Sequence, residues 1–573
     1  MRKKLITLVA LMAMGGLGIF SQTIKTLRLV ETTDVHGCFF GYDFMKDQKV
    51  DNGLDRVAAY VRGQRAQRGD EHVMLVDAGD VLQGQPCVYY ANFVDKELPA
   101  HIASDVYNYM RYDVGAFGNH DIEATPPVYR RWMKDCKFPV LGANIIDDAT
   151  GKPFAQPYCM IKKDGMRIAV IGMLTPAIPM WLPEKMWQGL SFRDIEQETA
   201  AWIKKIKRKE HPDLVIGLFH SGFDAPRMNG YKEDATKSVA ENIPGFDIIC
   251  CGHDHRPIVE TVRNKKTGRD VWILNSGARA HNVAQADIDY VKKGRRVIIK
   301  SIKGELVSLK TVEPDKEFTA RYAGFVDTVR KFVAAPVGRM ATPVHGSDYF
   351  FGNSEFADLI HGTQFRQVEA DISLVTPLSA DLIIEAGELT MRDAFRLYRF
   401  ENMIDVIEMS GKEIRGALEK SYDNWIHNPA ADGHVVKMKQ RKGRMQLEGF
   451  HFLMVSAAGV SYDVDVTKPL GQRLIMKNMK DGSKFDEDKT YRVAVNSYIG
   501  SGGGAILTEG AGISREELTK RVVDTTPLDL RHYLIEYLGT LNPSQGLPRY
   551  SDWQFVPVDI VKPLIVKDRK ILF

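Results

Sequence analysis

The stretch Gly118-Asn119-His120-Asp121-Ile122-Glu123 directly follows the apolar run Val114-Gly115-Ala116-Phe117. A short apolar run followed by an amide, an imidazole and two carboxylates is typical of a buried strand that carries reactive groups at its carboxyl end. Taken alone the stretch is weak evidence, because Gly-Asn is usually a turn and a single His is more often structural than catalytic. Its meaning therefore depends on the other strand ends of the chain.

Strand-like runs alternate with helical stretches through the first half of the chain. Leu27–Val30, His72–Val76 and Leu214–Phe219 are short and apolar, whereas Leu54–Arg65 and Ile195–Lys209 carry apolar residues at helical spacing. This alternation predicts an α/β domain with a largely parallel or mixed sheet. Its reactive groups are expected at the carboxyl ends of the strands.

Four more predicted strands of this half end in residues that can bind metal ions. These ends are Thr33-Asp34-Val35-His36-Gly37, Asp77-Ala78-Gly79-Asp80, His220-Ser221-Gly222 and Gly252-His253-Asp254-His255. In Asp34-x-His36 and His253-x-His255 the residues stand two apart, so on an extended chain both side chains of a pair point the same way. Together with Asn119, these strand ends offer two carboxylates, one amide oxygen and four imidazoles. This set suffices for two adjacent ions that share one carboxylate.

Each of these motifs alone is equally consistent with a turn, a structural His or a surface loop. Their joint occurrence at five strand ends predicts a site for two divalent transition metal ions. Carboxylate and imidazole together suit Zn, Mn, Co or Fe better than Ca or Mg.

The same motifs resemble the five blocks of the calcineurin-like metallophosphoesterase superfamily. With the N-terminal segment and a second domain, the whole chain resembles the bacterial 5'-nucleotidase family. Leu29–Asp34, His220–Gly222 and Ser461–Thr467 are most similar to its periplasmic 2',3'-cyclic-nucleotide 2'-phosphodiesterase/3'-nucleotidase members. This resemblance implies an α/β (α+β) fold, in which a four-layer metallophosphoesterase β-sandwich with flanking helices precedes a second α/β substrate-binding domain.

The resemblance also implies roles for individual residues. One metal ion would be held by Asp34, His36, Asp80 and His255, and the other by Asp80, Asn119, His220 and His253. His120 would stabilise the transition state or protonate the leaving oxygen during attack by metal-activated water. The 5'-nucleotidases place an Asp three residues after this His, where this chain has Glu123, and Asp121 follows the His at once. Whether Glu123, Asp121 or neither orients His120 stays open.

The substrate-binding residues depart from the family pattern. Phe452 matches the aromatic residue that stacks on the base, although Phe452–Val455 also reads as an ordinary core strand. The second stacking aromatic belongs at or after the cluster Ser501–Gly504, where no aromatic residue stands, and Tyr498 is the candidate replacement. The segment Thr376–Asp381 has no phosphate-binding Arg.

The implied activity is hydrolysis of a nucleotide or a related small phosphate ester, either as a 5'-nucleotidase or as a 2',3'-cyclic-nucleotide 2'-phosphodiesterase/3'-nucleotidase. The same chemistry on a UDP-sugar, a sugar phosphate or a thiosulfonate ester is the first alternative. A non-enzymatic exported binding protein is the second, and it would have lost metal ligands that this chain retains.

A chain of 573 residues is too long for one core. We predict a signal peptide at 1–21, a metallophosphoesterase domain at 22–312, a linker helix at 313–336 and a substrate-binding domain at 337–573. The formal net charge of +4 includes Arg2, Lys3 and Lys4. No basic stripe with interleaved aromatic residues indicates nucleic-acid binding, and no obligatory protein partner is evident.

The segment Met1–Ser21 has a basic start, an apolar run and small residues near its end, which is typical of a secretory signal. Its apolar run of about 16 residues, broken by glycines, is shorter than the ~20 that a membrane-spanning helix needs. We therefore expect an exported protein of the periplasm or cell surface without stable membrane insertion. The six cysteines are too few for a disulfide scaffold, and their pairing stays open.

Overall fold

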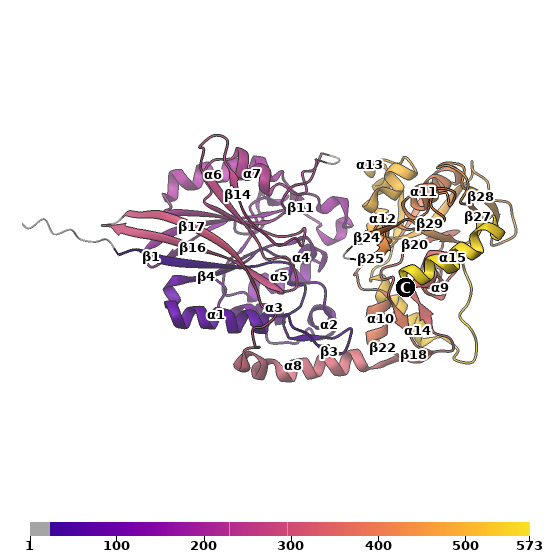
Figure 1. Ribbon diagram of the computed structural model, residues 1–573, viewed down its shortest axis with the longest axis horizontal. Coiled ribbons are helices and arrows are strands. Elements are labelled where there is room, and N and C mark those ends of the chain that lie inside the picture. Colours follow the sequence, from indigo (N-terminus) through magenta and orange to yellow (C-terminus); the bar gives the residue numbers. More distant parts are fainter. Residues whose placement is uncertain (1–22, 228–229, 295, 442) are drawn as a thin grey trace, which may run out of the picture.

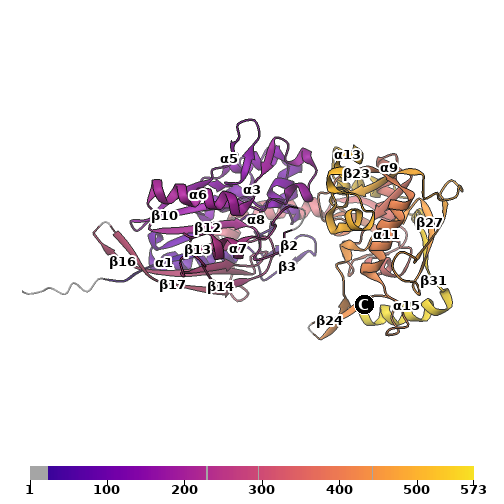
Figure 2. The ribbon, with the colours of Figure 1, turned by 90° about the horizontal axis from the view of Figure 1, so that it is seen from above.

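The computed structural model describes residues 23–227, 230–294, 296–441 and 443–573. The predicted signal peptide at 1–21 lies outside these residues. Two domains lie side by side, and helix α8 (Lys316–Ala334) runs from the first to the second (Figures 1 and 2). This helix lies within the predicted linker 313–336, and the exact domain boundaries remain a prediction.

The first domain contains two mixed six-stranded sheets. In spatial order, the first sheet consists of β17 (Arg296–Ser308), β16 (Asn282–Lys293), β1 (Lys25–Thr32), β4 (Val73–Asp77), β5 (Val114–Ala116) and β6 (Val140–Leu141). The second consists of β14 (Ile258–Arg263), β15 (Asp270–Asn275), β13 (Ile248–Cys251), β12 (Leu214–His220), β10 (Met166–Leu174) and β9 (Tyr158–Lys163).

The sheets pack face to face, and each is covered by helices on its outer face. Leu29 of β1 points into the core between the sheets, whereas its neighbour Val30 points into the core beneath the helices. This alternation is the two-residue period of a strand that is buried on both faces. The helices on the first sheet are α1 (Leu54–Arg68), α3 (Ile102–Met110), α5 (Pro126–Asp135) and α8, and those on the second are α6 (Ile195–Glu210) and α7 (Thr236–Asn242). The predicted four-layer sandwich is confirmed.

The central strands of each sheet are parallel. In the first sheet β1, β4, β5 and β6 run the same way, and in the second β10, β12, β13 and β15 do. Their carboxyl ends therefore meet at one edge of the sandwich. Helix α4 (Asn119–Glu123) begins at this edge, on the side of the first domain that faces the second (Figure 1).

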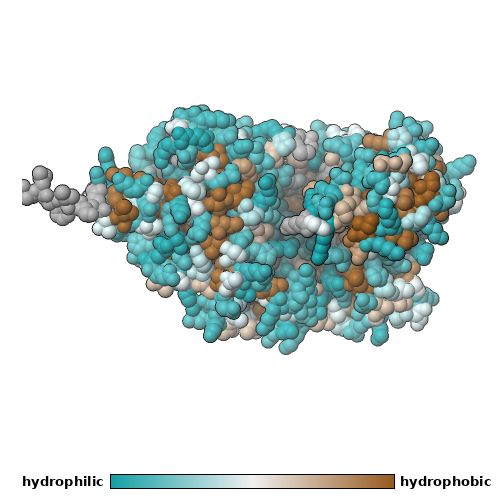
Figure 3. All heavy atoms as spheres, in the orientation of Figure 1, coloured by the Kyte–Doolittle hydropathy of each residue, from teal (hydrophilic) through white to brown (hydrophobic). Residues whose placement is uncertain are grey.

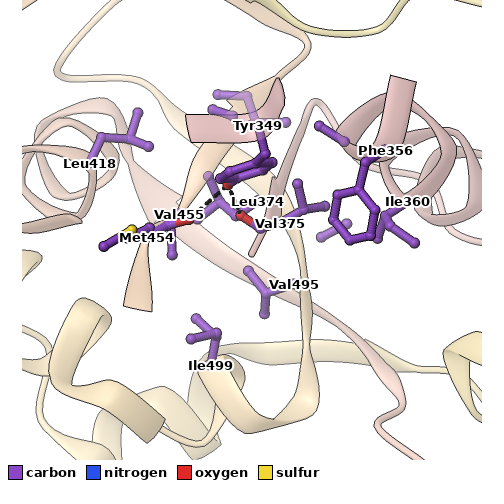
Figure 4. Close-up of a cluster of buried hydrophobic side chains, with 14 of the residues drawn as sticks. Tyr349, Phe356, Ile360, Leu374, Val375, Leu418, Met454, Val455, Val495 and Ile499 are labelled. Atoms are coloured by element: carbon purple, nitrogen blue, oxygen red, sulfur yellow. Dashed lines mark hydrogen bonds between the residues drawn. The ribbon is translucent and has the colours of Figure 1, made fainter. Parts of the chain in front are cut away.

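The second domain is built on a five-stranded sheet flanked by helices. Its strands, in spatial order, are β26 (Ser456–Ala458), β20 (Ile372–Val375), β29 (Thr490–Asn496), β23 (Ile404–Ser410) and β30 (Val522–Thr525). Helices α9 (Glu355–Gln367), α10 (Met391–Leu397), α11 (Gly411–Trp425) and α14 (Leu530–Gly539) contribute to one hydrophobic core. Figure 4 shows part of this core, where the Tyr349 hydroxyl lies 2.8 Å from the carbonyl oxygens of Val375 and Met454.

The interpretation of Phe452–Val455 as a strand is wrong. His451–Leu453 forms a single 3₁₀ turn, and the strand begins only at Ser456. Met454 and Val455 are buried in the core, whereas Phe452 is only partly buried. A short apolar run does not reveal whether burial comes from a strand or from a turn, because periodicity needs a longer stretch.

The face of the molecule in Figure 3 is largely hydrophilic, with smaller hydrophobic patches on both domains. Within the described part of the chain, no helix combines the length and the apolar content needed to cross a bilayer. All six cysteines are free thiols, and Cys250 and Cys251 are packed in the interior.

Candidate metal centre and catalytic histidine

The seven predicted metal ligands come together at the carboxyl edge of the sandwich. One group contains Asp34, His36, Asp80 and His255, whose ligand atoms all lie within 4.8 Å of one another. Nε2 of His36 is 3.0 Å from Nε2 of His255, which is 3.3 Å from Oδ1 of Asp34. Two imidazole nitrogens that face each other among carboxylates fit a cation held between them.

A second group lies beside the first and shares Asp80 with it. Nε2 of His220 is 3.1 Å from Oδ2 of Asp80 and 3.0 Å from Oδ1 of Asn119. Nδ1 of His253 is 2.9 Å from the same Asn119 oxygen. The donor set therefore fits a second ion, with Asp80 in the position of a bridging carboxylate.

The outward nitrogen of three of these imidazoles has its own hydrogen-bond acceptor. Nδ1 of His220 lies 2.8 Å from the Ala78 carbonyl oxygen, and Nδ1 of His36 lies 3.2 Å from that of Gln83. Nε2 of His253 lies 2.9 Å from Oε1 of Glu233. Such contacts fix which ring nitrogen keeps its proton and leave the other free for a metal ion. Sequence reasoning missed Glu233, because it lies in a loop and follows no strand.

The backbone of the ligand loops is not extended. The φ angles are 51° at Asp34, 49° at His36, 63° at Asp80, 81° at His253 and 55° at His255. The reasoning from an extended Asp-x-His or His-x-His segment is therefore wrong, although the side chains do meet. Left-handed backbone at a residue other than glycine costs about 1–3 kcal/mol and clusters at functional sites.

Two glycines leave room for the carboxylates. A Cβ atom on Gly118 would lie 2.1 Å from Oδ1 of Asp80, and one on Gly252 would lie 2.7 Å from Oδ2 of Asp34. Neither carboxylate could keep its position beside a larger residue. Gly118 precedes Asn119 and Gly252 precedes His253. Each glycine therefore lets one predicted metal ligand lie close to another, Asn119 to Asp80 and His253 to Asp34.

His120 and the two acidic residues after it have distinct contacts. Nδ1 of His120 pairs with the Glu123 carboxylate one turn further along α4. Asp121 points away from His120 and accepts hydrogen bonds from the backbone. Its donors are the N–H groups of Asp80, Val81, Leu82 and Gly118, at 2.7 to 3.0 Å. Glu123 is therefore the acid beside His120, and Asp121 holds the loop that carries Asp80.

The charge around His120 favours its protonated form. Burial lowers the pKa of His120, but Asp80, Glu123 and, to a smaller extent, Glu401 raise it to about 10. A cation bound beside Asp80 would oppose this effect and bring the pKa down. The neighbouring carboxylates therefore favour a proton on the imidazole.

Phe452 and Tyr498 come together in the second domain. Their ring centroids are 6.3 Å apart, with the rings nearly perpendicular. Phe450 stacks on Phe452 at 5.3 Å and is 62% exposed. The two predicted substrate contacts therefore belong to one aromatic group with an exposed edge, and Phe450 was not predicted.

The two domains also meet at a buried cluster around Arg531, which no sequence motif indicated. The guanidinium carbon of Arg531 lies 4.5 Å from the ring centroid of Tyr89, at the end of α2 (Pro86–Tyr89). It lies 4.2 Å from the ring centroid of Phe395 in the second domain. Arg531 donates a hydrogen bond to Glu401, and both side chains are buried. A cation between two rings fixes this part of the interface.

The fold and the convergent Asp, Asn and His side chains define a metal-dependent phosphoesterase. Residues 27–257 match the family model of the calcineurin-like phosphoesterases, and residues 336–509 match that of the 5'-nucleotidase C-terminal domain. The chain belongs to the two-domain 5'-nucleotidase family.

Similar proteins span nearly the whole chain. A 2',3'-cyclic-nucleotide 2'-phosphodiesterase/3'-nucleotidase of Haemophilus influenzae is 25% identical, with 93% of this chain and 88% of the relative covered. A 5'-nucleotidase of Vibrio cholerae is 23% identical, with 88% and 92% covered. The structure of a Staphylococcus aureus protein described as a candidate 5'-nucleotidase superposes with a TM-score of 0.74 at 23% identity, covering 93% of this chain and 100% of that one. The chain is therefore a hydrolase of the nucleotidase and phosphoesterase class.

Proposed function

We propose that this protein is an exported phosphohydrolase with two metal ions that releases phosphate from nucleotides. The observation that carries the proposal is the convergence of seven donor side chains into two groups that share Asp80, with His120 on the adjoining helix turn. The names of the relatives support nucleotides as substrates, but they differ in the position of the phosphate.

Each group of donors would hold one divalent ion. Asp34, His36, Asp80 and His255 would bind the first, and Asp80, Asn119, His220 and His253 the second. Two such ions would supply Lewis-acid chemistry, which neutralises phosphate charge and acidifies water at neutral pH. Zn, Mn, Co and Fe all suit this mixture of imidazole, carboxylate and amide ligands.

The protein's own groups would position the ester and move one proton. Water attacks phosphorus as the bond to the leaving oxygen breaks, and His120 gives its proton to that oxygen. Glu123 holds Nδ1 of His120, so that Nε2 can face the ester. The backbone N–H of His120 donates a hydrogen bond to Oδ1 of Asp80 at 2.9 Å. This contact holds the proposed proton donor beside the shared metal ligand.

The second domain would select the leaving alcohol. Phe452 and Tyr498 offer aromatic surface to a nucleoside, and stacking on a base tolerates any base. UDP-sugars, sugar phosphates and thiosulfonate esters remain alternative substrates of the same centre. A binding protein without activity is less well supported, because all seven donors are in place.

A panel assay tests the function. Metal-loaded protein is expected to release phosphate from 3'-AMP or 5'-AMP, or to open 2',3'-cAMP, faster than it acts on UDP-glucose, glucose 6-phosphate or a thiosulfonate. His120→Ala should lower kcat about 100-fold or more with an unchanged metal content. Hydrolysis of only the other esters would reject nucleotides, and near-normal kcat in the variant would reject the role of His120.

Export is proposed from the residues Met1–Ser21 alone. Sequencing the N-terminus of the mature protein after expression in a bacterium should find a chain that starts near Gln22, outside the cytoplasm. A full-length chain in the cytoplasm would contradict export without affecting the proposed chemistry.

A further inference from the structure

Trp181 lies directly against the candidate metal centre. It follows the short 3₁₀ turn Ile178–Met180, and its ring centroid is 5.4 Å from that of His253, with 31° between the ring planes. The indole is only partly buried. A large aromatic side chain beside a metal ligand, with part of its surface exposed, offers contact area to whatever is bound there.

Trp181 also lies at the boundary with the second domain. The carbonyl oxygen of its neighbour Met180 accepts hydrogen bonds from Oγ of Ser501 at 3.2 Å and from Nη1 of Arg515 at 2.8 Å. Arg515 donates in addition to the carbonyl oxygens of Ser501 and Gly502, at 2.6 and 2.8 Å. One guanidinium therefore joins the turn before Trp181 to the glycine cluster of the second domain.

The glycine cluster also contacts the ring of Tyr498. A Cβ atom on Gly503 would lie 2.7 Å from the Tyr498 ring, so only glycine lets the ring pack there. Oγ of Ser501, which contacts the Met180 carbonyl oxygen, also lies 3.1 Å from the carbonyl oxygen of Tyr498. Trp181 and Tyr498, one in each domain, are therefore linked through Met180 and Ser501.

We propose that Trp181 determines substrate specificity, and that it forms with Tyr498 and Phe452 a two-domain site for a flat aromatic leaving group. The group it would take is the base of a nucleoside, whose faces can stack on an indole and on a phenyl ring. This inference rests on the proposed function and names the residue of the first domain that recognises the substrate.

The test compares two substrates in Trp181→Ala, Trp181→Phe and the control Trp202→Phe. Trp202 lies on α6, on the outer face of the sandwich away from the metal centre. We expect Trp181→Ala to raise KM about 10-fold for 3'-AMP or 5'-AMP, whichever the wild type prefers. Its kcat/KM for glycerol 3-phosphate, which has no ring, should stay within about twofold, and Trp181→Phe should keep most of the affinity.

A binding measurement gives a second readout. Adenosine, which has no phosphate, should quench tryptophan fluorescence in the wild type and in Trp202→Phe. It should not do so in Trp181→Phe, because the stacked indole is gone. Metal content by mass spectrometry accompanies every variant, since Trp181 packs on His253.

Several results would overturn the inference. Equal losses on both substrates would mean that Trp181 merely supports His253, and an unchanged KM for the nucleotide would mean that it touches no base. If the wild type hydrolysed glycerol 3-phosphate and no nucleotide, the proposed function would fail as well. Normal nucleotide hydrolysis that is insensitive to Trp181→Ala would contradict the role of Trp181 only.

Discussion

His120 is paired through Nδ1 with Glu123, three residues further along the same helix. A carboxylate in this position fixes both the ring orientation and the nitrogen that keeps its proton. Glu123 is buried and His120 is partly exposed, so in the proposed mechanism Nε2 is the ring nitrogen left for the ester.

Glu123→Gln should lower kcat about 10- to 100-fold while KM and metal content change little, because an amide holds the imidazole less firmly. Steady-state kinetics with a nucleoside monophosphate provide the measurement. Glu97→Gln, an exposed position in the same domain, should behave as the wild type. A kcat within twofold of normal would show that Glu123 does not position His120.

Glu233→Gln should weaken binding of one metal ion about 10- to 100-fold, because the carboxylate that orients His253 is lost. Titration of metal-free protein with Zn or Mn, followed by calorimetry, would detect one weakened site and one normal site. Glu260→Gln, on the exposed strand β14, is the control. If both sites of the variant bound metal with the affinity of the wild type, the Glu233 contact would contribute nothing to metal binding.

Arg531→Met should destabilise the folded protein by about 3–5 kcal/mol, because it leaves Glu401 buried without a partner. The double variant with Glu401→Gln should recover part of this loss. Arg521→Met, which breaks the more exposed pair with Glu413, should cost at most about 1 kcal/mol. Denaturant unfolding measures all four proteins, and a double variant no better than Arg531→Met would contradict the buried-charge explanation.

Acid should destabilise the second domain through His361. This residue of α9 is fully buried, with Nδ1 2.7 Å from Oγ of Ser373, and burial lowers its pKa to about 3. In the unfolded chain its pKa is about 6.5, so between these values only the unfolded chain binds the proton. Stability contributed by the neutral ring is present above about pH 6.5 and is lost as the pH falls, by about 1.4 kcal/mol per unit.

His361→Gln should make unfolding of the second domain less sensitive to pH between about 6 and 4 by roughly one proton. Denaturant melts monitored by tryptophan fluorescence at several pH values would give the slope. His101 of the first domain has a similarly lowered pKa of about 3, so part of the acid sensitivity of the whole protein should remain. An unaltered slope would show that His361 is not the group responsible.

The sequence predicted the sandwich, and the meeting of the candidate metal ligands at one edge, because both depend on local signals. Apolar runs mark strands that are buried on both faces, and parallel strands place their carboxyl ends at one edge, so Asp34, Asp80 and His220 could be expected to meet. The backbone conformation of the ligand loops was not predictable. Asp34 and His253 have left-handed backbone, and neither residue type indicates that conformation.

Contacts between segments far apart in the chain could not be predicted from the sequence either. Glu233, Trp181 and Arg531 belong to no motif, and their roles arise only when a loop or the second domain packs against the first. Phe452 was assigned to the wrong element for a related reason, because its burial is decided by partners far along the chain. The choice between Asp121 and Glu123 likewise depended on which backbone amides face α4.

Helix α4 joins Asn119, His120 and, through the contacts of Asp121, the Asp80 loop into one rigid unit. In the proposed mechanism the groups that would bind metal and move the proton therefore all belong to the first domain. An ancestor could have exchanged or reshaped its second domain without losing hydrolysis of the phosphate ester. Such separation of reaction from selection would let one catalytic module diversify over many leaving alcohols during evolution.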